Sequence, residues 1–332
     1  MVIPPAIAAL PRFPLLDGPS PLARLERFSA ALGSGAEVWI KREDLLPLAF
    51  GGNKLRNLEF LVGAALAEGA DTLITSGRRW SNHCRLTAAA GARAGLAVQL
   101  ILTGPPPSPG EEGPNQRLDE MLGATVHVTS TDDRAERAAL VASIAAEVRA
   151  AGRRPFIVGV GGTGPIGASG QVLAGLETAD QLRAAGIGEA TVVLPSATGG
   201  THAGVLTGLT LAGPPDRHVI GFAVASPTAE LRPTIEGILD GLVPLAGIRI
   251  RNDAIILNDD QRGIGYGRPT TAAADAARLL ARTEGILVDP IYTAKALAGL
   301  VSGVRDRRLT GPIVFWHAGG TPGIFEALPP PG

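Results

Sequence analysis

Short apolar runs alternate along this chain with longer amphipathic segments, and this alternation limits the folds open to it. The apolar runs predict buried strands over residues 71–77, 97–103, 124–128, 155–160, 191–195, 218–225 and 312–316. Segments with helical spacing predict helices over residues 81–94, 115–122 and 132–151. Strands separated by helices indicate an α/β fold with mainly parallel sheets that carry helices on both faces. Ligands of such sheets bind at the carboxyl ends of the strands, so functional residues are expected in the loops there.

The bulk properties fit a protein of the cytoplasm. The 332 residues, 45% of them hydrophobic, suffice for one large domain or two closely packed lobes. A formal net charge of -1 supplies no basic field for nucleic acid or for an anionic membrane surface. The one cysteine, Cys84, excludes a disulfide framework, and residues 1–16 lack the pattern of a signal peptide. We therefore expect no nucleic-acid partner, no membrane partner and no metal site.

A lysine follows a glycine turn in the segment Gly51-Gly-Asn-Lys54. Apolar residues recur at helical spacing from Leu58 to Ala65, which places Lys54 in the first turn of a helix. Such a lysine could bind phosphate as a point charge or form an imine with an aldehyde cofactor. A solvated surface lysine is the alternative, and this segment does not decide between them.

Two further segments lie between a predicted strand and a predicted helix. In Ser81-Asn82-His83 the serine could cap the helix, but three hydrogen-bonding side chains at one edge favour a ligand site. The small residues of the segment 197–202 expose successive backbone N–H groups in front of a helix N-terminus. That arrangement predicts an anion site, most often for phosphate, with an ordinary glycine turn as the alternative.

Both tyrosines of the chain, Tyr266 and Tyr292, fall in loop motifs, Gly-Tyr-Gly-Arg-Pro and Asp-Pro-Ile-Tyr-Thr. A single tyrosine is more often a packed aromatic with a satisfied hydroxyl. Their shared location in loops nevertheless makes both candidates for a site.

Taken in order, these motifs resemble the D-cysteine desulfhydrase and 1-aminocyclopropane-1-carboxylate (ACC) deaminase family of pyridoxal-phosphate enzymes. The matching segments are Lys41-Arg-Glu-Asp44, Gly51-Gly-Asn-Lys54, Ser81-Asn-His83, Gly161-Gly162, Thr198-Gly-Gly-Thr201, Asp289-Pro-Ile-Tyr292 and His317-Ala-Gly-Gly320. The resemblance implies fold type II, the tryptophan-synthase-β-like fold, with two lobes that each contain a mainly parallel sheet. It implies a large domain of residues 1–56 plus 166–332, a small domain of residues 57–165 inserted in it, and a homodimer.

The resemblance also assigns roles by position. Lys54 would be the Schiff-base lysine of pyridoxal phosphate, and Asn82 would meet the ring hydroxyl. The remaining cofactor contacts would be Asn53, Thr293 and the phosphate cradle formed by the backbone of Ala197, Thr198, Gly199, Gly200 and Thr201. Ser81 would bind the substrate carboxylate or act as a nucleophile, with Asn82 and His83 beside it. Tyr266 and Tyr292 match the two active-site tyrosines of the family.

Three positions depart from the family pattern. Arg78-Arg79-Trp80 replaces small neutral residues before Ser81, so Arg78 and Trp80 are predicted substrate contacts. The two cations fit a second anionic group on the substrate, unless both point to solvent or pair with acids of the other lobe. Ala318 stands where desulfhydrases commonly carry a threonine that can partner the pyridine nitrogen, a role then open to Thr293 or Thr321. Thr293 also replaces the glutamate of ACC deaminases, which argues against cyclopropane opening.

The expected reaction is β-elimination from a small amino acid, with D-cysteine giving pyruvate, sulfide and ammonia. Three alternatives stay open at this point. They are an L-cysteate sulfo-lyase or a biosynthetic relative with an anionic substrate, an ACC deaminase, and a non-catalytic regulatory protein that binds pyridoxal phosphate.

Overall fold

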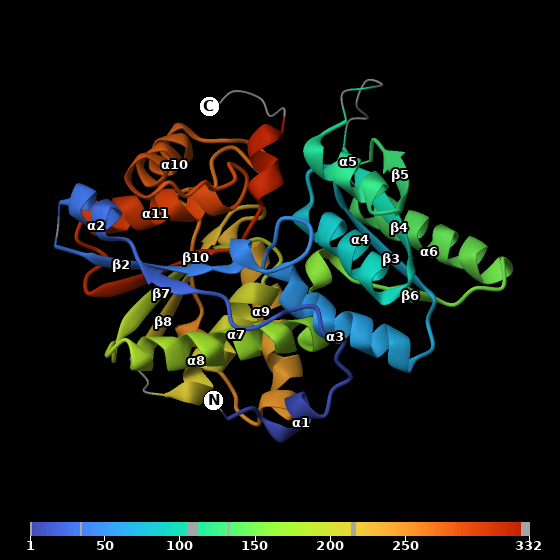
Figure 1. Cartoon of the computed structure of the whole chain (residues 1–332), viewed down its shortest axis with the longest axis horizontal. Coiled ribbons are helices and arrows are strands. Elements are labelled where there is room, and N and C mark those ends of the chain that lie inside the picture. Colours follow the sequence, from blue (N-terminus) through green and yellow to red (C-terminus); the bar gives the residue numbers. More distant parts are fainter. Residues whose placement is uncertain are drawn as a thin grey trace.

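The computed structural model describes residues 2–33, 35–104, 110, 112–131, 133–213 and 217–326. In this part of the chain the strands form two sheets, which Figure 1 shows side by side with helices around each. The larger sheet has the order β1-β2-β10-β7-β8-β9, and the smaller has the order β5-β4-β3-β6. Every pair is parallel except β1 with β2. The predicted α/β class with mainly parallel sheets is confirmed.

The elements have the following bounds. The larger sheet contains β1 (Leu22–Arg24), β2 (Glu37–Arg42), β7 (Ala190–Ser196), β8 (Arg217–Ala223), β9 (Ile256–Asn258) and β10 (Pro312–His317). The smaller contains β3 (Thr72–Arg78), β4 (Ala97–Thr103), β5 (Thr125–Thr129) and β6 (Pro155–Ile157). The α-helices are α1 (Pro5–Ala8), α2 (Glu26–Leu32), α3 (Lys54–Ala67), α4 (Asn82–Ala94), α5 (Pro114–Met121), α6 (Arg134–Ala150), α7 (Pro165–Ala184), α8 (Gly200–Ala212), α9 (Thr228–Ala246), α10 (Thr271–Glu284) and α11 (Thr293–Arg305). Short 3-10 turns are η1 (Glu43–Leu45), η2 (Val160–Gly162), η3 (Asn252–Ala254) and η4 (Thr321–Phe325). Among the described helices, none has the length and apolar character that a membrane crossing requires.

The larger sheet is buried on both faces. Along β7, Val192 and Leu194 point to one side and Val193 to the other, because successive side chains of a strand alternate. The first side packs against α7, α8 and α9, and the second packs against α2, α10 and α11. Figure 1 shows these helix layers below and above the sheet. Burial on both faces explains why the central strands read as continuous apolar runs in the sequence.

The smaller sheet follows the same rule. In β3, Leu73 packs in the core formed with α3 and α4, and Ile74 packs on the opposite face. There Ile144 of α6 covers it. Helix α6 thereby packs across this face of the sheet.

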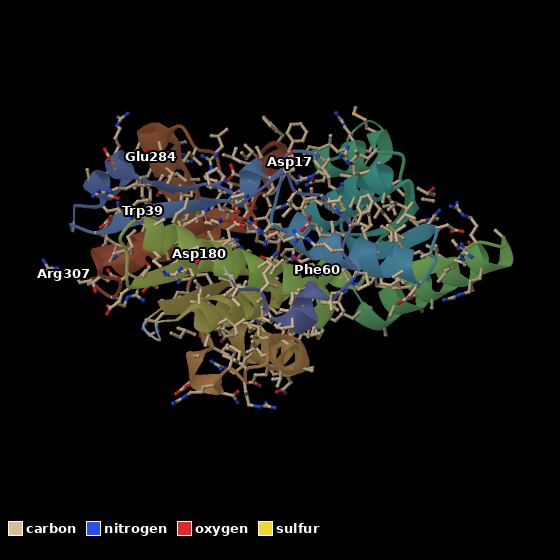
Figure 2. The ribbon with its side chains drawn as sticks, turned by 60° about the horizontal axis from the view of Figure 1, so that its bottom comes forward. Asp17, Trp39, Phe60, Asp180, Glu284 and Arg307 are labelled. Carbon is tan, nitrogen blue, oxygen red and sulfur yellow. The ribbon has the colours of Figure 1, made fainter. Side chains whose placement is uncertain are left out.

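Helix α3 joins the two cores. Leu58 and Val62 pack in the core of the smaller sheet, while Phe60 packs in the core of the larger sheet. Figure 2 shows Phe60 near the middle of the molecule. Because Lys54 is the first residue of α3, burial of both faces of this helix fixes the lysine between the two lobes.

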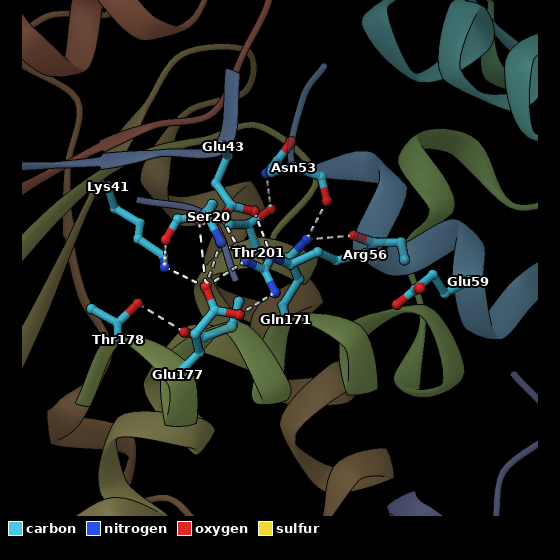
Figure 3. Close-up of polar contacts among 12 residues, drawn as sticks. Ser20, Lys41, Glu43, Asn53, Arg56, Glu59, Gln171, Glu177, Thr178 and Thr201 are labelled. Atoms are coloured by element: carbon cyan, nitrogen blue, oxygen red, sulfur yellow. Dashed lines mark hydrogen bonds and ion pairs between the residues drawn. The ribbon is translucent and has the colours of Figure 1, made fainter. Parts of the chain in front are cut away.

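A buried ionic network ties the start of α3 to the larger sheet (Figure 3). Arg56 donates to Glu43 Oε2 from Nε at 2.6 Å and to Glu177 Oε1 from Nη2 at 2.9 Å. Lys41 donates to Glu177 and, at 2.8 Å, to the backbone oxygen of Ser20. Burial opposes ionisation of Glu43, but the charge of Arg56 holds the pKa of this carboxyl below its ordinary value. In this protein the Lys-Arg-Glu-Asp motif therefore supplies buried ion pairs that position α3.

Three predicted boundaries were wrong, and one of them is the end of the strand predicted over residues 218–225, which lies at Ala223. The strand predicted over residues 155–160 ends at Ile157, because residues 160–162 form a turn in which Gly161 has a φ of 71°. Glycine adopts this left-handed backbone without a steric penalty, so the glycine run ends the strand. The helix predicted over residues 132–151 begins at Arg134, after Asp133 caps it by accepting the N–H groups of Ala135 and Glu136. Asp132 lies outside the described residues.

Candidate active site

A cavity of about 380 Å³ lies at the carboxyl ends of the strands. Its lining comes from the loops that follow β3, β7, β8 and β10, together with the start of α3. These loops are where the strand pattern places a ligand site. Of the residues singled out in the sequence, the lining contains Asn53, Lys54, Arg78, Ser81, Asn82, His83, Ala197, Thr198, Gly199, Thr201, Tyr266, Tyr292 and Thr293.

Lys54 projects into this cavity from the first turn of α3. Its Nζ has no hydrogen-bond or ion-pair partner among the residues that the structure describes. Removal of the side chain from water lowers the pKa of Lys54 from 10.5 to about 8. An amine with this pKa is partly neutral near pH 7, so it can act as a nucleophile toward an aldehyde or accept a proton. Lys54 is half-buried and faces this cavity, so it is not a freely solvated surface lysine.

Two glycine segments pack on each other beside Lys54. The backbone N–H of Asn53 donates to the carbonyl oxygen of Ala318 at 3.0 Å. A Cβ on Gly319 would lie 2.5 Å from the Cα of Gly52, so a side chain here would force the segments apart. This close approach brings the loop after β10 to the start of α3.

The loop after β7 leads into the N-terminus of α8 at the cavity. Gly199 precedes the helix with a φ of 82°, and no side chain among the described residues caps the helix. The first N–H groups of the helix therefore face the cavity without an intrahelical partner, and the helix dipole favours a negative charge there. Two side-chain hydrogen bonds hold the loop, from Asn53 Nδ2 to Thr201 Oγ1 at 2.8 Å and from Thr163 Oγ1 to Thr198 Oγ1 at 2.6 Å.

A second helix N-terminus meets the cavity after β3. Ser81 is the N-cap of α4, and its Oγ accepts the N–H of Cys84 at 3.2 Å. The serine hydroxyl keeps its own proton to donate, so the capping role and a ligand role are compatible. Asn82 is oriented from behind, because Arg85 Nη1 donates to Asn82 Oδ1 at 3.1 Å. The amide nitrogen of Asn82 is thereby left as the donor.

His83 is buried, and its hydrogen bonds define its tautomer. Thr75 Oγ1 donates to the carbonyl oxygen of Val158 at 2.8 Å, so it accepts from His83 Nε2, which lies 3.0 Å away. Burial and the nearby charge of Lys54 lower the pKa of His83 to about 3. The ring is therefore neutral, with its proton on Nε2 and a bare acceptor at Nδ1.

One carboxylate organises the loop before α11. Asp289 accepts the backbone N–H groups of Ile291, Tyr292 and Thr293 at distances from 2.7 to 3.1 Å, and it accepts the Thr293 hydroxyl as well. This loop presents the Tyr292 hydroxyl directly to the hydroxyl of Tyr266. Burial raises the pKa of both tyrosines, so both phenols stay protonated across the ordinary pH range.

The segment 78–80 places its three side chains, those of Arg78, Arg79 and Trp80, in three different environments. Arg78 lines the cavity, while Arg79 is absent from the lining and lies near the carboxylate of Glu326. The Trp80 ring packs edge-on against Tyr266, with centroids 5.9 Å apart, and it is also absent from the lining. The structure thus brings Arg78 into the site and places Trp80 behind a tyrosine, where it supports the wall of the cavity.

Gly200, which belongs to the predicted phosphate cradle, has its backbone in the first turn of α8.

Sequence reasoning missed several residues of the cavity. Arg134 and Arg137 line it from α6, and Ser226 lines it from the loop after β8. Ser226 could have been found, because it follows a predicted strand directly. No local signal distinguishes the two arginines from other charged residues of a long helix.

The site suits a cofactor that carries an aldehyde and a phosphate. Lys54 supplies a desolvated amine, and the loop before α8 supplies an uncapped helix N-terminus for an anion. Asn82 and Thr293 add hydrogen-bonding groups between these two points of attachment. In the part of the chain described, no cluster of His, Cys, Asp or Glu side chains has the arrangement of a metal site.

Comparisons with known proteins agree with this chemistry. The model of the family "Pyridoxal-phosphate dependent enzyme" matches residues 14–319. The chain is 40% identical over 328 residues to D-cysteine desulfhydrase of Salmonella newport (strain SL254), a match that covers 97% of this chain and 98% of that protein. The same identity and coverage relate it to D-cysteine desulfhydrase of Salmonella enteritidis PT4 (strain P125109).

Two solved structures extend the comparison. The crystal structure of an ACC deaminase homologue superposes with a TM-score of 0.86 and 35% identity, covering 96% of this chain and 95% of the other. The crystal structure of a T.th. threonine deaminase has a TM-score of 0.66 at 19% identity, covering 91% and 92%, and it shares the fold. The neighbours confirm fold type II. With a family match over most of its length and an amine and an anion cradle facing one cavity, the chain belongs to the pyridoxal-phosphate-dependent enzymes.

Proposed function

We propose that this enzyme is a β-eliminating lyase of the D-cysteine desulfhydrase type, which converts D-cysteine and water to pyruvate, sulfide and ammonia. The observation that carries the proposal is the desolvated Lys54 in one cavity with the Ser81 edge and the tyrosine pair. The relatives named D-cysteine desulfhydrase, 40% identical over nearly the whole chain, support the substrate.

Pyridoxal phosphate would be held at three places. Lys54 Nζ would carry the covalent bond to its aldehyde carbon, and residues 197–201 would receive its phosphate. Asn53, Asn82 and Thr293 would hold the ring. When bound, the cofactor supplies an electron sink that acidifies the Cα–H of the amino acid attached to it.

Lys54 would then move the proton of Cα. As a free amine its Nζ would lie in a desolvated place, where its pKa is about 8. A neutral amine of this kind accepts the Cα proton, and its ammonium form can return a proton later in the cycle.

The N-terminus of α4 would bind the substrate carboxylate. Ser81 can donate its hydroxyl, and the first N–H groups of the helix point the same way. A carboxylate fixed there would orient the Cα–H bond toward Lys54. We propose this binding role for Ser81, rather than a nucleophilic one, because its hydroxyl oxygen already accepts the N–H of Cys84.

The two tyrosines would serve the leaving group. Tyr266 and Tyr292 share a hydrogen bond between their hydroxyls, and burial keeps both protonated. One phenol of such a pair can donate a proton to the thiolate that leaves Cβ, while the other phenol donates a hydrogen bond to the phenolate that results.

Thr293 is our proposed partner of the pyridine nitrogen. It lines the cavity beside Ala318, whose methyl group cannot form a hydrogen bond, whereas Thr321 is not part of the lining. The Thr293 hydroxyl donates to Asp289, so its oxygen remains an acceptor, which suits a protonated nitrogen.

Thr293→Ala is expected to lower kcat by about tenfold, which corresponds to the loss of one hydrogen bond to a charged group, while Thr293→Ser is expected to retain most of the activity. Equal kcat values for the alanine and serine variants would contradict this role.

A panel of amino acids tests the reaction. The holoenzyme is expected to release pyruvate from D-cysteine and β-chloro-D-alanine, and Lys54→Ala is expected to release none. ACC belongs in the panel as the second candidate substrate, because a structural neighbour is an ACC deaminase homologue. Absence of any keto acid from every substrate, with the cofactor bound to Lys54, would overturn the proposal and favour a regulatory protein that binds the cofactor.

We also propose a homodimer located in the cytoplasm and the domain division given above, of residues 57–165 inserted between 1–56 and 166–332. The two separate sheets support that division, since β3 to β6 all fall within residues 57–165. Light scattering of the purified enzyme tests the dimer, and a monomeric mass would contradict it.

A further inference from the structure

Three arginines form one wall of the active-site cavity. Arg78 is the last residue of β3, and Arg134 and Arg137 lie in the first turn of α6. Residues three apart in a helix share a face, so both side chains of α6 point the same way. Figure 1 shows α6 beside β3 and β4, and all three arginines line the same cavity. We call Arg78, Arg134 and Arg137 the arginine wall.

Helix α6 contributes two arginines to the wall. The described carboxylates near these two arginines do not balance their positive charge. Among the described residues that line the cavity, Asp289 is the one acid, and its oxygens already accept N–H groups of its own loop. Arg134 lies 3.7 Å from Glu230, but both side chains are mostly exposed, so this pair is weak. Arg137 is half-buried and makes no ion pair with any residue that the structure describes.

The arginines also repel one another. Partial burial, and then the charges of Arg134 and Arg78, lower the pKa of Arg137. Like charges gathered at a cavity destabilise the fold, and such arrangements concentrate at sites that bind a ligand of opposite charge.

The position of the wall indicates which part of a substrate it meets. Arg78 precedes Ser81 by three residues, and its charge acts on Tyr266. The wall therefore adjoins both the proposed carboxylate site and the tyrosines that would face the leaving group. Arg134 Nη2 also approaches Ser226 Oγ of the larger lobe at 3.4 Å, so the wall reaches from the smaller lobe to the larger.

We propose that the arginine wall binds an oxyanion at the end of a substrate side chain, so that the enzyme also accepts amino acids ending in a sulfonate, sulfate ester or carboxylate and prefers them to neutral analogues of the same size. The inference deepens the proposed lyase function and rests on it. The phosphate of the cofactor has its own cradle at α8, which leaves the wall for the substrate.

Serine O-sulfate is a suitable probe for the reaction. In its elimination, Cα loses a proton, and the Cβ–O bond breaks with its electron pair leaving on sulfate. One water molecule then releases ammonia and leaves pyruvate. β-Chloroalanine undergoes the corresponding loss of chloride and has no oxyanion, so it serves as the neutral reference.

The decisive quantity is the ratio of kcat/KM for serine O-sulfate to kcat/KM for β-chloroalanine, measured on the holoenzyme with both enantiomers. Arg137→Gln and Arg134→Gln are each expected to lower this ratio about tenfold to a hundredfold, mainly through KM, as loss of a charged hydrogen bond does. Arg79→Gln is the matched control. It removes the same charge from a residue outside the cavity, and it is expected to leave the ratio unchanged.

Two kinetic outcomes would overturn the proposal. The first is that the ratio in the Arg134 and Arg137 variants equals the ratio in Arg79→Gln. The other is a loss of cofactor affinity in the wall variants with equal loss for both substrates, which would assign the arginines to the cofactor phosphate.

A binding measurement separates this inference from the lyase function. Equilibrium binding of serine O-sulfate and of alanine to the holoenzyme is followed through the cofactor absorbance, whether or not turnover occurs. A preference for the sulfate ester that Arg137→Gln removes supports the anion site even if no pyruvate forms. Equal affinity for both amino acids overturns it even if β-chloroalanine is turned over.

Discussion

Lys54 lowers the free energy of unfolding of the protein. Its amine is desolvated without a carboxylate beside it, and its pKa falls from 10.5 to about 8. Because the unfolded chain binds this proton more tightly, the effect is fully present below pH 8 and fades as the pH rises toward 10.5. At about 1.4 kcal/mol per pKa unit, the loss near pH 7 is at most about 3 kcal/mol.

Replacement of this lysine by an apolar residue should therefore stabilise the cofactor-free protein. Lys54→Met is expected to raise the free energy of unfolding by up to about 3 kcal/mol at pH 7, and the gain should shrink toward pH 10.5. Urea unfolding of both apo-proteins across this pH range measures the difference. A difference that does not change with pH would contradict desolvation as the cause.

The first two turns of α3 depend on buried charges rather than on apolar packing alone. Arg56 is 3% exposed and Glu43 fully buried, so removal of the arginine leaves a carboxylate without its compensating charge. Arg56→Met is expected to lower the free energy of unfolding by about 3–5 kcal/mol, as breaking a buried ion pair does. Arg24→Met serves as the control, because the Arg24–Glu37 pair is exposed and should contribute less than about 1 kcal/mol. Similar losses in the two variants would show that the network is not the source of stability.

The crossing of α7 over α3 requires glycine at position 170. A Cβ there would lie 1.9 Å from the carbonyl oxygen of Arg56, so the helices would have to separate. Gly170→Ala is expected to destabilise by about 1–3 kcal/mol, despite the higher helix propensity of alanine. Gly237→Ala, in α9 with open space around its Cβ, should instead be neutral or stabilise by up to about 1 kcal/mol. Thermal unfolding of both variants measures the contrast, and a stabilised Gly170 variant would contradict the close crossing.

Residues of both lobes line the cavity, so cofactor binding there should stabilise the whole chain. Pyridoxal phosphate at a hundredfold excess over its Kd is expected to raise the free energy of unfolding by about 2.7 kcal/mol. Pyridoxal lacks the phosphate that the loop before α8 would receive, so it should raise the unfolding midpoint less at equal concentration. Calorimetry of the apo-protein with each compound provides the measurement. Equal shifts with the two compounds would exclude that loop as the phosphate site.

Much of this site follows from local sequence. The apolar runs define the central strands, because strands buried on both faces need continuous apolar residues. The glycine turn before Lys54 and the small residues at 197–201 predict a helix start and an anion cradle, because backbone geometry at a helix N-terminus depends on neighbours in the chain. The parallel sheets then bring these loops to one edge, which made a shared site predictable.

The remainder depends on contacts between segments far apart in the chain. Arg134 and Arg137 reach the cavity because α6 packs across the smaller sheet, and no spacing within α6 encodes that placement. Arg78 faces the cavity from the last position of β3, whereas Arg79 lies in the turn that follows and approaches Glu326 instead. The sequence thus determined that an amine and an anion site would lie at one edge of the sheets, because each of the two is a property of a short segment. Tertiary packing decided which charges surround the substrate, because the position of a side chain around a cavity depends on how whole helices and strands pack together.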